Sequence, residues 1–327
     1  MPLDLIVRRE YDPAALLAKH PPKLKHPHKR LVFELACPPH ATHRGPVTVT
    51  RWRAAALPAN LELARVELIV SRGYYDYRDS GPGTWHVNFA DPQLFVAYGS
   101  SLLAQDELQA AEHPVLGSVR EALLAEKLPA QTEENLEPTP VLVANVERRC
   151  EIATAPDLDA GRPYGLYGNR FASATAEVVR KAIRLVDPPT ISNLIAIAAP
   201  GGGRGAYFRR DLDRILLTAY TGFLAAVSES HRSSPGTTVE IRTGFWGCGA
   251  FGGNRHAMTL LQLLAARLAG IARLRFYAFD DNGEADVRAG VADLERVPGA
   301  GRVGESLDDL MERIADLDYE WGISDGN

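Results

Sequence analysis

The chain is 327 residues long, 46% of them hydrophobic and 24% charged, with a formal net charge of −5. This composition excludes a disordered chain, and the negative charge argues against a surface that attracts polyanions, so we expect no direct nucleic-acid binding. Cys37, Cys150 and Cys248 stand singly, which excludes a disulfide framework and any metal-ligand spacing, so the sequence predicts no metal and no cofactor.

Strands and helices alternate in the predicted element order. Residues 1–30 are polar and become basic toward Arg30, and we interpret them as a solvated arm, with contact to a polymer or nucleic acid as the alternative. Strands are predicted at Leu31–Ala36, Val47–Arg53, Leu63–Val70, Trp85–Ala90, Thr139–Val146, Leu194–Ala199, Thr237–Arg242 and Leu274–Phe279. Helices are predicted at Ser101–Glu112, Ser118–Lys127, Ser173–Leu185, Arg209–Val227, Arg255–Ala269 and Leu307–Leu317. This alternation favours a three-layer α/β sandwich. No apolar run reaches the roughly 18 residues of a membrane span, so we expect a cytoplasmic protein without membrane contact.

The most informative stretch is Thr243–Asn254, TGFWGCGAFGGN, between a predicted strand and a predicted helix. Asn254 is a candidate N-cap and Gly270 a candidate stop for that helix. A glycine-rich loop between a strand and a helix N-terminus allows backbone N–H groups to approach an anion closely. The stretch lacks the Gly-Lys-Ser/Thr of a P-loop, and the G-x-G-x-x-G spacing from Gly247 to Gly252 alone is weak evidence for dinucleotide binding. A tight turn without a ligand is the alternative.

A second glycine run, Gly201–Gly205, also lies between a predicted strand and a predicted helix. We favour a flexible surface connection over an anion-binding turn there.

TGFWGCGAFGG at Thr243–Gly253 resembles the second phosphate-loop motif of the poly(ADP-ribose) glycohydrolase (PARG) family. Val87–Gln109, VNFADPQLFVAYGSSLLAQDELQ, is similar to the first signature of that family, and the likeness extends roughly from residue 66 to residue 282. The resemblance implies a macrodomain-like α/β/α sandwich with a mixed central sheet and N-terminal additions. Residues 66–327 would form the catalytic domain and residues 1–65 an accessory segment.

Gln105, Asp106 and Glu107 occupy the positions of the Gln-Glu-Glu of the family. Cleavage of a glycosidic bond needs a carboxyl group that protonates the leaving atom and then activates water. The resemblance implies that Glu107 is this residue, that Asp106 orients the distal ribose and that Gln105 contacts substrate. The alternative is a helix N-terminus that carries acids because the helix dipole favours them.

The remaining predicted binding residues come from three loops. The resemblance places the diphosphate on the second loop, with Phe251 beside the distal ribose, and Tyr167 over the adenosine. The predicted binding residues of the second loop are Gly247, Cys248, Gly249, Ala250, Phe251 and Gly252. The first loop departs from the family, because Phe95–Ala97 replace three glycines and Asp91 replaces an asparagine. Asp91 and Asp106 could hold a guanidinium, which favours mono-ADP-ribose on arginine over the polymer.

The sequence therefore predicts a hydrolase that releases ADP-ribose from an ADP-ribosylated protein or from poly(ADP-ribose). The first alternative is a reader module that binds ADP-ribose without hydrolysing it. The second is a structural or partner-binding protein whose site is blocked by Phe95–Ala97.

Overall fold

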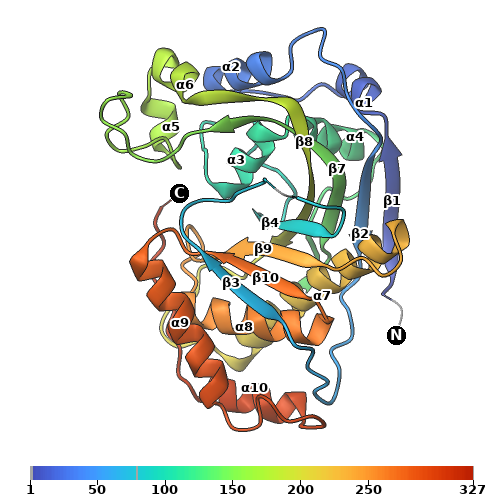
Figure 1. Cartoon of the computed structure of the whole chain (residues 1–327), viewed down its shortest axis with the longest axis vertical. Helices are drawn as coiled ribbons and strands as arrows, with labels where there is room; N and C mark the ends of the chain where they lie inside the picture. Colours follow the sequence, from blue (N-terminus) through green and yellow to red (C-terminus); the bar gives the residue numbers. More distant parts are fainter. Residues whose placement is uncertain (1–2, 79, 327) are drawn as a thin grey trace.

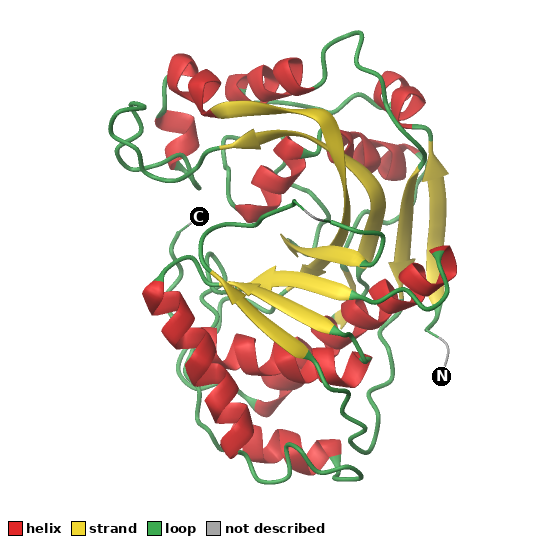
Figure 2. Ribbon diagram, in the orientation of Figure 1, coloured by secondary structure: helices red, strands yellow, loops and turns green. Residues whose placement is uncertain are grey.

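The computed structural model describes residues 3–78 and 80–326, built around one eight-stranded mixed sheet (Figures 1 and 2). In spatial order its strands are β1 (Leu5–Tyr11), β2 (Val47–Trp52), β7 (Val141–Ile152), β8 (Ile183–Ala198), β4 (Thr84–Ala90), β9 (Glu240–Gly244), β10 (Arg273–Tyr277) and β3 (Glu67–Ser71). The last five strands of this order run parallel to one another, whereas β1–β2, β2–β7 and β7–β8 pair antiparallel. β5 (Glu133–Glu134) and β6 (Glu137–Pro138) form a separate small hairpin.

Helices cover both faces of the sheet, which confirms the predicted three-layer sandwich (Figure 2). One layer contains α7 (Arg209–Ser233), α8 (Arg255–Ala269), α9 (Asp281–Arg296) and α10 (Leu307–Ala315). The other contains α1 (Pro13–Lys19), α2 (Pro27–Ala36), α3 (Gln105–Glu112), α4 (Val115–Ala125), α5 (Arg170–Ser173) and α6 (Ala176–Ala182). No helix in the described ranges combines the length and apolar composition that a membrane crossing requires.

The predicted helix Arg255–Ala269 is confirmed as α8, with both of its predicted ends. The Asn254 side chain accepts the backbone N–H groups of His256 and Ala257, and Gly270 ends the helix in the left-handed conformation at φ 68°. A residue with a side chain would be strained at that φ, so the glycine fixes where α8 stops.

The predicted strand Leu31–Ala36 is wrong, because these residues belong to α2. Pro27 stands in the first turn, where its fixed φ suits a helix, and the His26 side chain accepts the backbone N–H of His28. The buried positions are helically spaced, at His28, Lys29, Val32 and Ala36. The start signal thus outweighs the apolar run that suggested a strand.

The first 65 residues contribute β1 and β2 to the edge of the main sheet. β1, α1 and α9 were not expected from the sequence. The division of the chain at residue 65 remains a prediction.

Gly201–Gly205 lies largely exposed, as the interpretation of a flexible surface connection expected. Its flexibility needs correction at two positions, because a Cβ on Gly203 would lie 2.0 Å from the Trp321 ring, and one on Gly201 2.8 Å from Phe251. Close packing, rather than flexibility, therefore requires glycine at both positions.

Pairing between β4 and β9 stops before the carboxyl end of β4. β4 pairs with β9 only over Thr84–His86, whereas it pairs with β8 as far as Ala90. The backbone of β4 beyond His86 therefore lacks a strand partner on its β9 side, and side chains must satisfy its polar groups.

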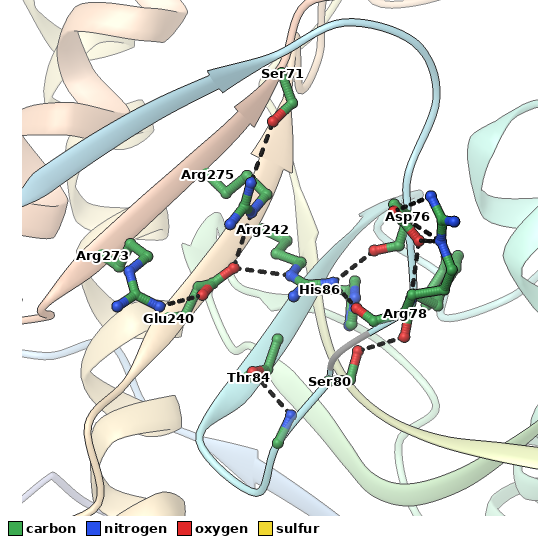
Figure 3. Close-up of polar contacts among 12 residues, drawn as sticks. Ser71, Asp76, Arg78, Ser80, Thr84, His86, Glu240, Arg242, Arg273 and Arg275 are labelled. Carbon is green, nitrogen blue, oxygen red and sulfur yellow. Dashed lines mark hydrogen bonds and ion pairs between the residues drawn. The ribbon is translucent and has the colours of Figure 1, made fainter.

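A buried charge cluster joins β9 and β10 beside this opening (Figure 3). The Glu240 carboxylate accepts hydrogen bonds from Arg242 Nε (2.9 Å), Arg273 Nη1 (2.9 Å) and Arg275 Nε (3.0 Å). Arg242 Nη1 also donates to the carbonyl oxygen of Asp76 at 2.6 Å, which ties the β3–β4 connection to the sheet. Burial works to raise the pKa of Glu240, but the three guanidinium groups overcome it and hold the pKa at about 2.

We expect Glu240→Gln to destabilise the protein by about 3 kcal/mol, because it leaves the buried Arg242 guanidinium and two partly exposed ones without their carboxylate. The wild-type contribution should be fully present above pH ~4.3, the ordinary pKa of Glu, and be lost as pH falls toward about 2. Urea unfolding of both proteins between pH 3 and pH 7 measures the difference. Equal free energies of unfolding at neutral pH would contradict this account of the cluster.

Candidate functional site

Two predicted loops meet at the carboxyl ends of β4 and β9, where ligands of parallel α/β sheets commonly bind. The β4–α3 loop (residues 91–104) and the β9–α8 loop (residues 245–254) border a cavity of about 520 Å³. Ten predicted site residues line it, namely Asp91, Gln105, Asp106, Glu107, Tyr167, Gly247, Cys248, Gly249, Ala250 and Phe251. Gly252 is outside this lining. The structure thus brings together residues that are far apart in the sequence.

The β9–α8 loop presents a group of unpaired backbone donors. The N–H groups of Cys248, Gly252 and Gly253 donate to carbonyl oxygens inside the loop. Those of Gly247, Gly249, Ala250 and Phe251 donate to no other residue within residues 3–78 and 80–326. A Cβ on Gly247 would lie 2.5 Å from that of Ala199, so only glycine allows this path. Successive unpaired amides ahead of a helix N-terminus form a site for an anion.

Gly252 has a structural part in this loop. It adopts φ 67°, donates its N–H to the Gly249 carbonyl oxygen at 3.0 Å and accepts the N–H of Gly322 at 2.8 Å. Its contribution is therefore to shape the turn. Its predicted contact with substrate stays a prediction.

Asp106 and Glu107 stand in the first turn of α3 and are only 6% and 5% exposed. Asp106 Oδ1 accepts a hydrogen bond from Asn88 Nδ2 on β4 (2.9 Å), a partner that the sequence analysis did not single out. Glu107 Oε2 accepts the backbone N–H of Ala104 (3.0 Å), so Glu107 caps the helix. The catalytic role of Glu107 stays a prediction.

Burial raises the pKa of both carboxyl groups, and repulsion from Glu107 raises that of Asp106 further. The nearby ammonium group of Lys29 acts in the opposite direction on both. A buried carboxyl with a raised pKa can hold a proton close to neutral pH and donate it to a leaving group.

Gln105 fixes α3 against β4. Its Oε1 accepts the N–H of Phe89 at 2.7 Å, and its Nε2 donates to the carbonyl oxygen of Val87 at 3.1 Å. The Tyr75 hydroxyl also donates to Val87 O, at 3.1 Å. These side chains satisfy the part of β4 that β9 leaves unpaired, so the position of the acid pair depends on Gln105.

Phe95 of the β4–α3 loop does not block the cavity. Phe95 is fully buried in the hydrophobic core and does not line the cavity, although its φ of 51° is unusual for a residue other than glycine. Val96 and Ala97 do line the cavity, and Val96 is 43% exposed. Asp91 lines it as well, and its Oδ1 accepts the N–H of Gln93 at 2.8 Å.

Tyr167 lies where this cavity meets a second one of about 770 Å³. Six residues line both cavities, namely Tyr74, Phe89, Gln105, Thr154, Tyr167 and Phe279. The second cavity contains the buried ion pair between Arg148 and Glu112 (2.8 Å), with the guanidinium over the ring of Tyr77. Together the cavities offer an elongated space with an anion-binding end and aromatic walls.

The segment Tyr319–Gly326 brings one residue, Asp325, to the site, which no sequence signal indicated. The Trp321 ring stacks on Tyr207 at a centroid distance of 4.1 Å, and Asn169 Nδ2 donates to the Gly326 carbonyl oxygen at 3.0 Å. Asp325 lines the cavity, and its backbone N–H donates to the Gly249 carbonyl oxygen at 3.4 Å. A carboxylate thus stands beside the unpaired amides of the β9–α8 loop.

No group of His, Cys, Asp and Glu side chains in the described part of the chain is arranged to hold a metal ion. The fold and the site define an α/β protein whose cavity combines a loop of unpaired backbone amides with a buried acid pair.

Comparison with known proteins connects this arrangement to one family. Residues 181–286 match the model of the family described as poly(ADP-ribose) glycohydrolase (PARG), macro domain fold. This segment contains the β9–α8 loop, and the match confirms the resemblance predicted from TGFWGCGAFGG.

Solved structures similar to this chain include PARG from Thermomonospora curvata, with 17% identity, a TM-score of 0.42 and coverage of 87% of this chain and 84% of that chain. Another is PARG from Deinococcus radiodurans in complex with ADP-ribose, with 14% identity, a TM-score of 0.44 and coverage of 88% and 94%.

We expect Gln105→Leu to destabilise the protein by about 1–3 kcal/mol, because the Phe89 N–H loses its acceptor and the Val87 carbonyl oxygen loses one of its donors. Gln93→Leu, at an exposed position of the β4–α3 loop that precedes α3, is the matched control and should leave stability unchanged. Denaturant unfolding measures both variants. If Gln105→Leu unfolds like the wild type, Gln105 does not hold α3 against β4.

Proposed function

We propose that the chain is a glycoside hydrolase that releases ADP-ribose from an ADP-ribosylated substrate. The observation that carries this proposal is one cavity with unpaired amides on one side and a buried acid pair on the other. The family matched by residues 181–286 acts on this class of bond, and one similar structure contains ADP-ribose.

In this proposal the diphosphate of the ligand binds the N–H groups of Gly247, Gly249, Ala250 and Phe251. The Phe251 ring, packed against Gly201, bounds the distal ribose, and Tyr167 closes the adenosine side. Aromatic rings suit these positions because they pack flat against sugar and base. The second cavity provides room beyond Tyr167 for the rest of the nucleoside.

Glu107 would act first as acid and then as base. Its carboxyl group donates a proton to the leaving atom while the bond from that atom to the anomeric carbon breaks. The resulting carboxylate then takes a proton from a water molecule whose oxygen adds to the same carbon. Asp106, held by Asn88, would orient the distal ribose and stabilise the oxocarbenium-like transition state.

We further propose mono-ADP-ribose on a protein side chain, arginine in particular, as the preferred substrate. Val96 and Ala97 line the cavity where the sequence pattern of the family has glycine, which alters the space near the predicted phosphate path and the distal ribose. Asp91 lines that part of the cavity and offers a carboxylate to a guanidinium.

A second candidate is a reader that binds ADP-ribose without cleaving it. Val96 and Ala97 favour it, because they occupy space near the predicted phosphate path. The buried acid pair favours the hydrolase.

Release of free ADP-ribose from a matched panel tests the proposal. The panel contains poly(ADP-ribose) and proteins mono-ADP-ribosylated on arginine, serine or acidic side chains. We expect release from the arginine-linked substrate, and a decrease in kcat of about 10²–10⁴-fold in Glu107→Gln with ADP-ribose binding retained. Retained turnover in Glu107→Gln would contradict the catalytic role. Binding of ADP-ribose with no release from any substrate would favour the reader.

We expect Asp325→Asn to tighten ADP-ribose binding by about 1 kcal/mol, roughly fivefold, because a carboxylate beside the loop repels the diphosphate. The exposed Asp318, outside the cavity lining, supplies the control Asp318→Asn, which should leave affinity unchanged. Calorimetry at low and high salt measures the effect, which salt should reduce. Equal affinities for Asp325→Asn and the wild type would mean that this carboxylate does not face the diphosphate.

A further inference from the structure

Lys29 is a buried cation directly behind the acid pair. Its side chain is among the largest that are fully buried, and the residue is only 2% exposed. Nζ donates to the backbone carbonyl oxygen of Glu107 at 3.3 Å and lies 5.7 Å from the centroid of the Phe171 ring. No carboxylate oxygen lies within 4.0 Å of Lys29 Nζ in the described part of the chain. A buried ammonium without a direct ion pair is costly, so its presence needs a reason.

The basic segment that the sequence analysis interpreted as solvated thus sends one lysine into the interior. α2 packs against α3 and α6, and His28 Nδ1 is 3.0 Å from the carbonyl oxygen of Phe171. This contact anchors the first turn of α2 and orients Lys29 toward α3. Lys25, four residues earlier, is exposed.

The charged and titratable groups around Lys29 come from several elements. α3 contributes Asp106 and Glu107, the β4–α3 loop contributes Asp91, and Tyr167 faces Glu107 across the cavity. His28 of α2 and the N-cap residue His26 also lie nearby. Burial lowers the pKa of Lys29 to about 8, with Glu107 and then Asp106 acting in the opposite direction. Lys29 in turn lowers the pKa of both carboxyl groups against the effect of burial.

Charge balance in a region of low dielectric explains this arrangement. With Lys29 protonated, the cluster is neutral when one of the two carboxyls is ionised and the other carries a proton. Without the ammonium, the cluster is neutral only when both carboxyls are protonated, and ionising either one leaves an uncompensated buried charge.

We propose that Lys29 is a positioning residue for the acid pair, and that its ammonium group holds Asp106 and Glu107 in a state that shares a single proton. The pair then contains one protonated carboxyl that can donate a proton and one carboxylate that can stabilise positive charge on the sugar. The catalytic consequence rests on the function proposed above, whereas the charge state of the pair can be measured without it.

Carbon-13 NMR titration of the labelled carboxyl groups tests the proposal, with Asp106→Asn and Glu107→Gln used for assignment. In Lys29→Met we expect the first deprotonation of the pair to move upward by about one pH unit or more. Lys25→Met removes the same charge from an exposed position of the same segment and should leave the titration unchanged. A folded Lys29→Met that titrates like the wild type would overturn the proposal.

A reciprocal measurement covers the case in which Lys29→Met does not fold. Coupling between two groups is mutual, so Asp106→Asn should lower the pKa of the Lys29 ammonium group in an otherwise wild-type chain. The Lys29 side-chain signals report this in a lysine-labelled sample. An unchanged titration of Lys29 in Asp106→Asn would contradict the proposal independently.

Kinetics separate this proposal from the proposed function. On an active substrate, Lys29→Met should lower kcat at neutral pH and move the basic limb of the pH profile upward, with KM within about twofold of the wild type. A wild-type chain that releases ADP-ribose from no substrate would defeat the proposed function, and the NMR titration would still decide the role of Lys29. An unmoved pH profile in active Lys29→Met would overturn the positioning role.

Discussion

The site depends on the point at which β4 leaves β9. A continuous ladder between these strands would fill the space at their carboxyl ends with backbone hydrogen bonds. The ladder stops at His86, and the Gln105 side chain and the Tyr75 hydroxyl take over the backbone groups of Val87 and Phe89. Because these polar groups are satisfied by side chains, the sheet can remain open there without leaving buried donors unpaired. The same contacts place α3, and with it the acid pair, opposite the β9–α8 loop.

The opening between β4 and β9 has groups of different electrostatic character on its two sides. On one side are backbone N–H groups that favour an anion, and on the other are two carboxyl groups whose pKa burial raises. The Lys29 ammonium lies close to the carboxyl groups, and the Asp325 carboxylate lies beside the backbone amides. Each side of the cavity therefore has a nearby charge of the sign opposite to its own. A ligand with a diphosphate at one end and a sugar with developing positive charge at the other matches this division.

Local sequence signals predicted the two loops and the helix that follows each of them. The N-cap Asn254, the left-handed Gly270 and the glycines of the β9–α8 loop all act through their own backbone, so their effects could be inferred from sequence. The acids of α3 were found because they are adjacent in the sequence and match a family pattern.

The features that were missed depend on contacts between distant segments. The sequence predicted a strand at Leu31–Ala36 because these residues are mostly apolar, although Pro27 is a helix start signal. Lys29 was therefore assigned to a solvated arm that ended before this strand. Asp325 reaches the site through backbone contacts of its segment, which carry no sequence pattern. In α9, Gly283 and Gly290 obscure the helical periodicity, although a Cβ on Gly290 would lie 2.7 Å from the His256 carbonyl oxygen of α8. Close helix packing, which cannot be read locally, requires that glycine.

Titration of an isotopically labelled sample with ADP-ribose, followed by amide NMR, tests the central claim most directly. The account predicts that the backbone N–H signals of Gly247, Gly249, Ala250 and Phe251 shift together, with one dissociation constant that also describes the shifts at Glu107 and Tyr167. ADP-ribose that leaves these four amides unchanged, or that shifts them without affecting Glu107, would contradict a single site shared by the two loops.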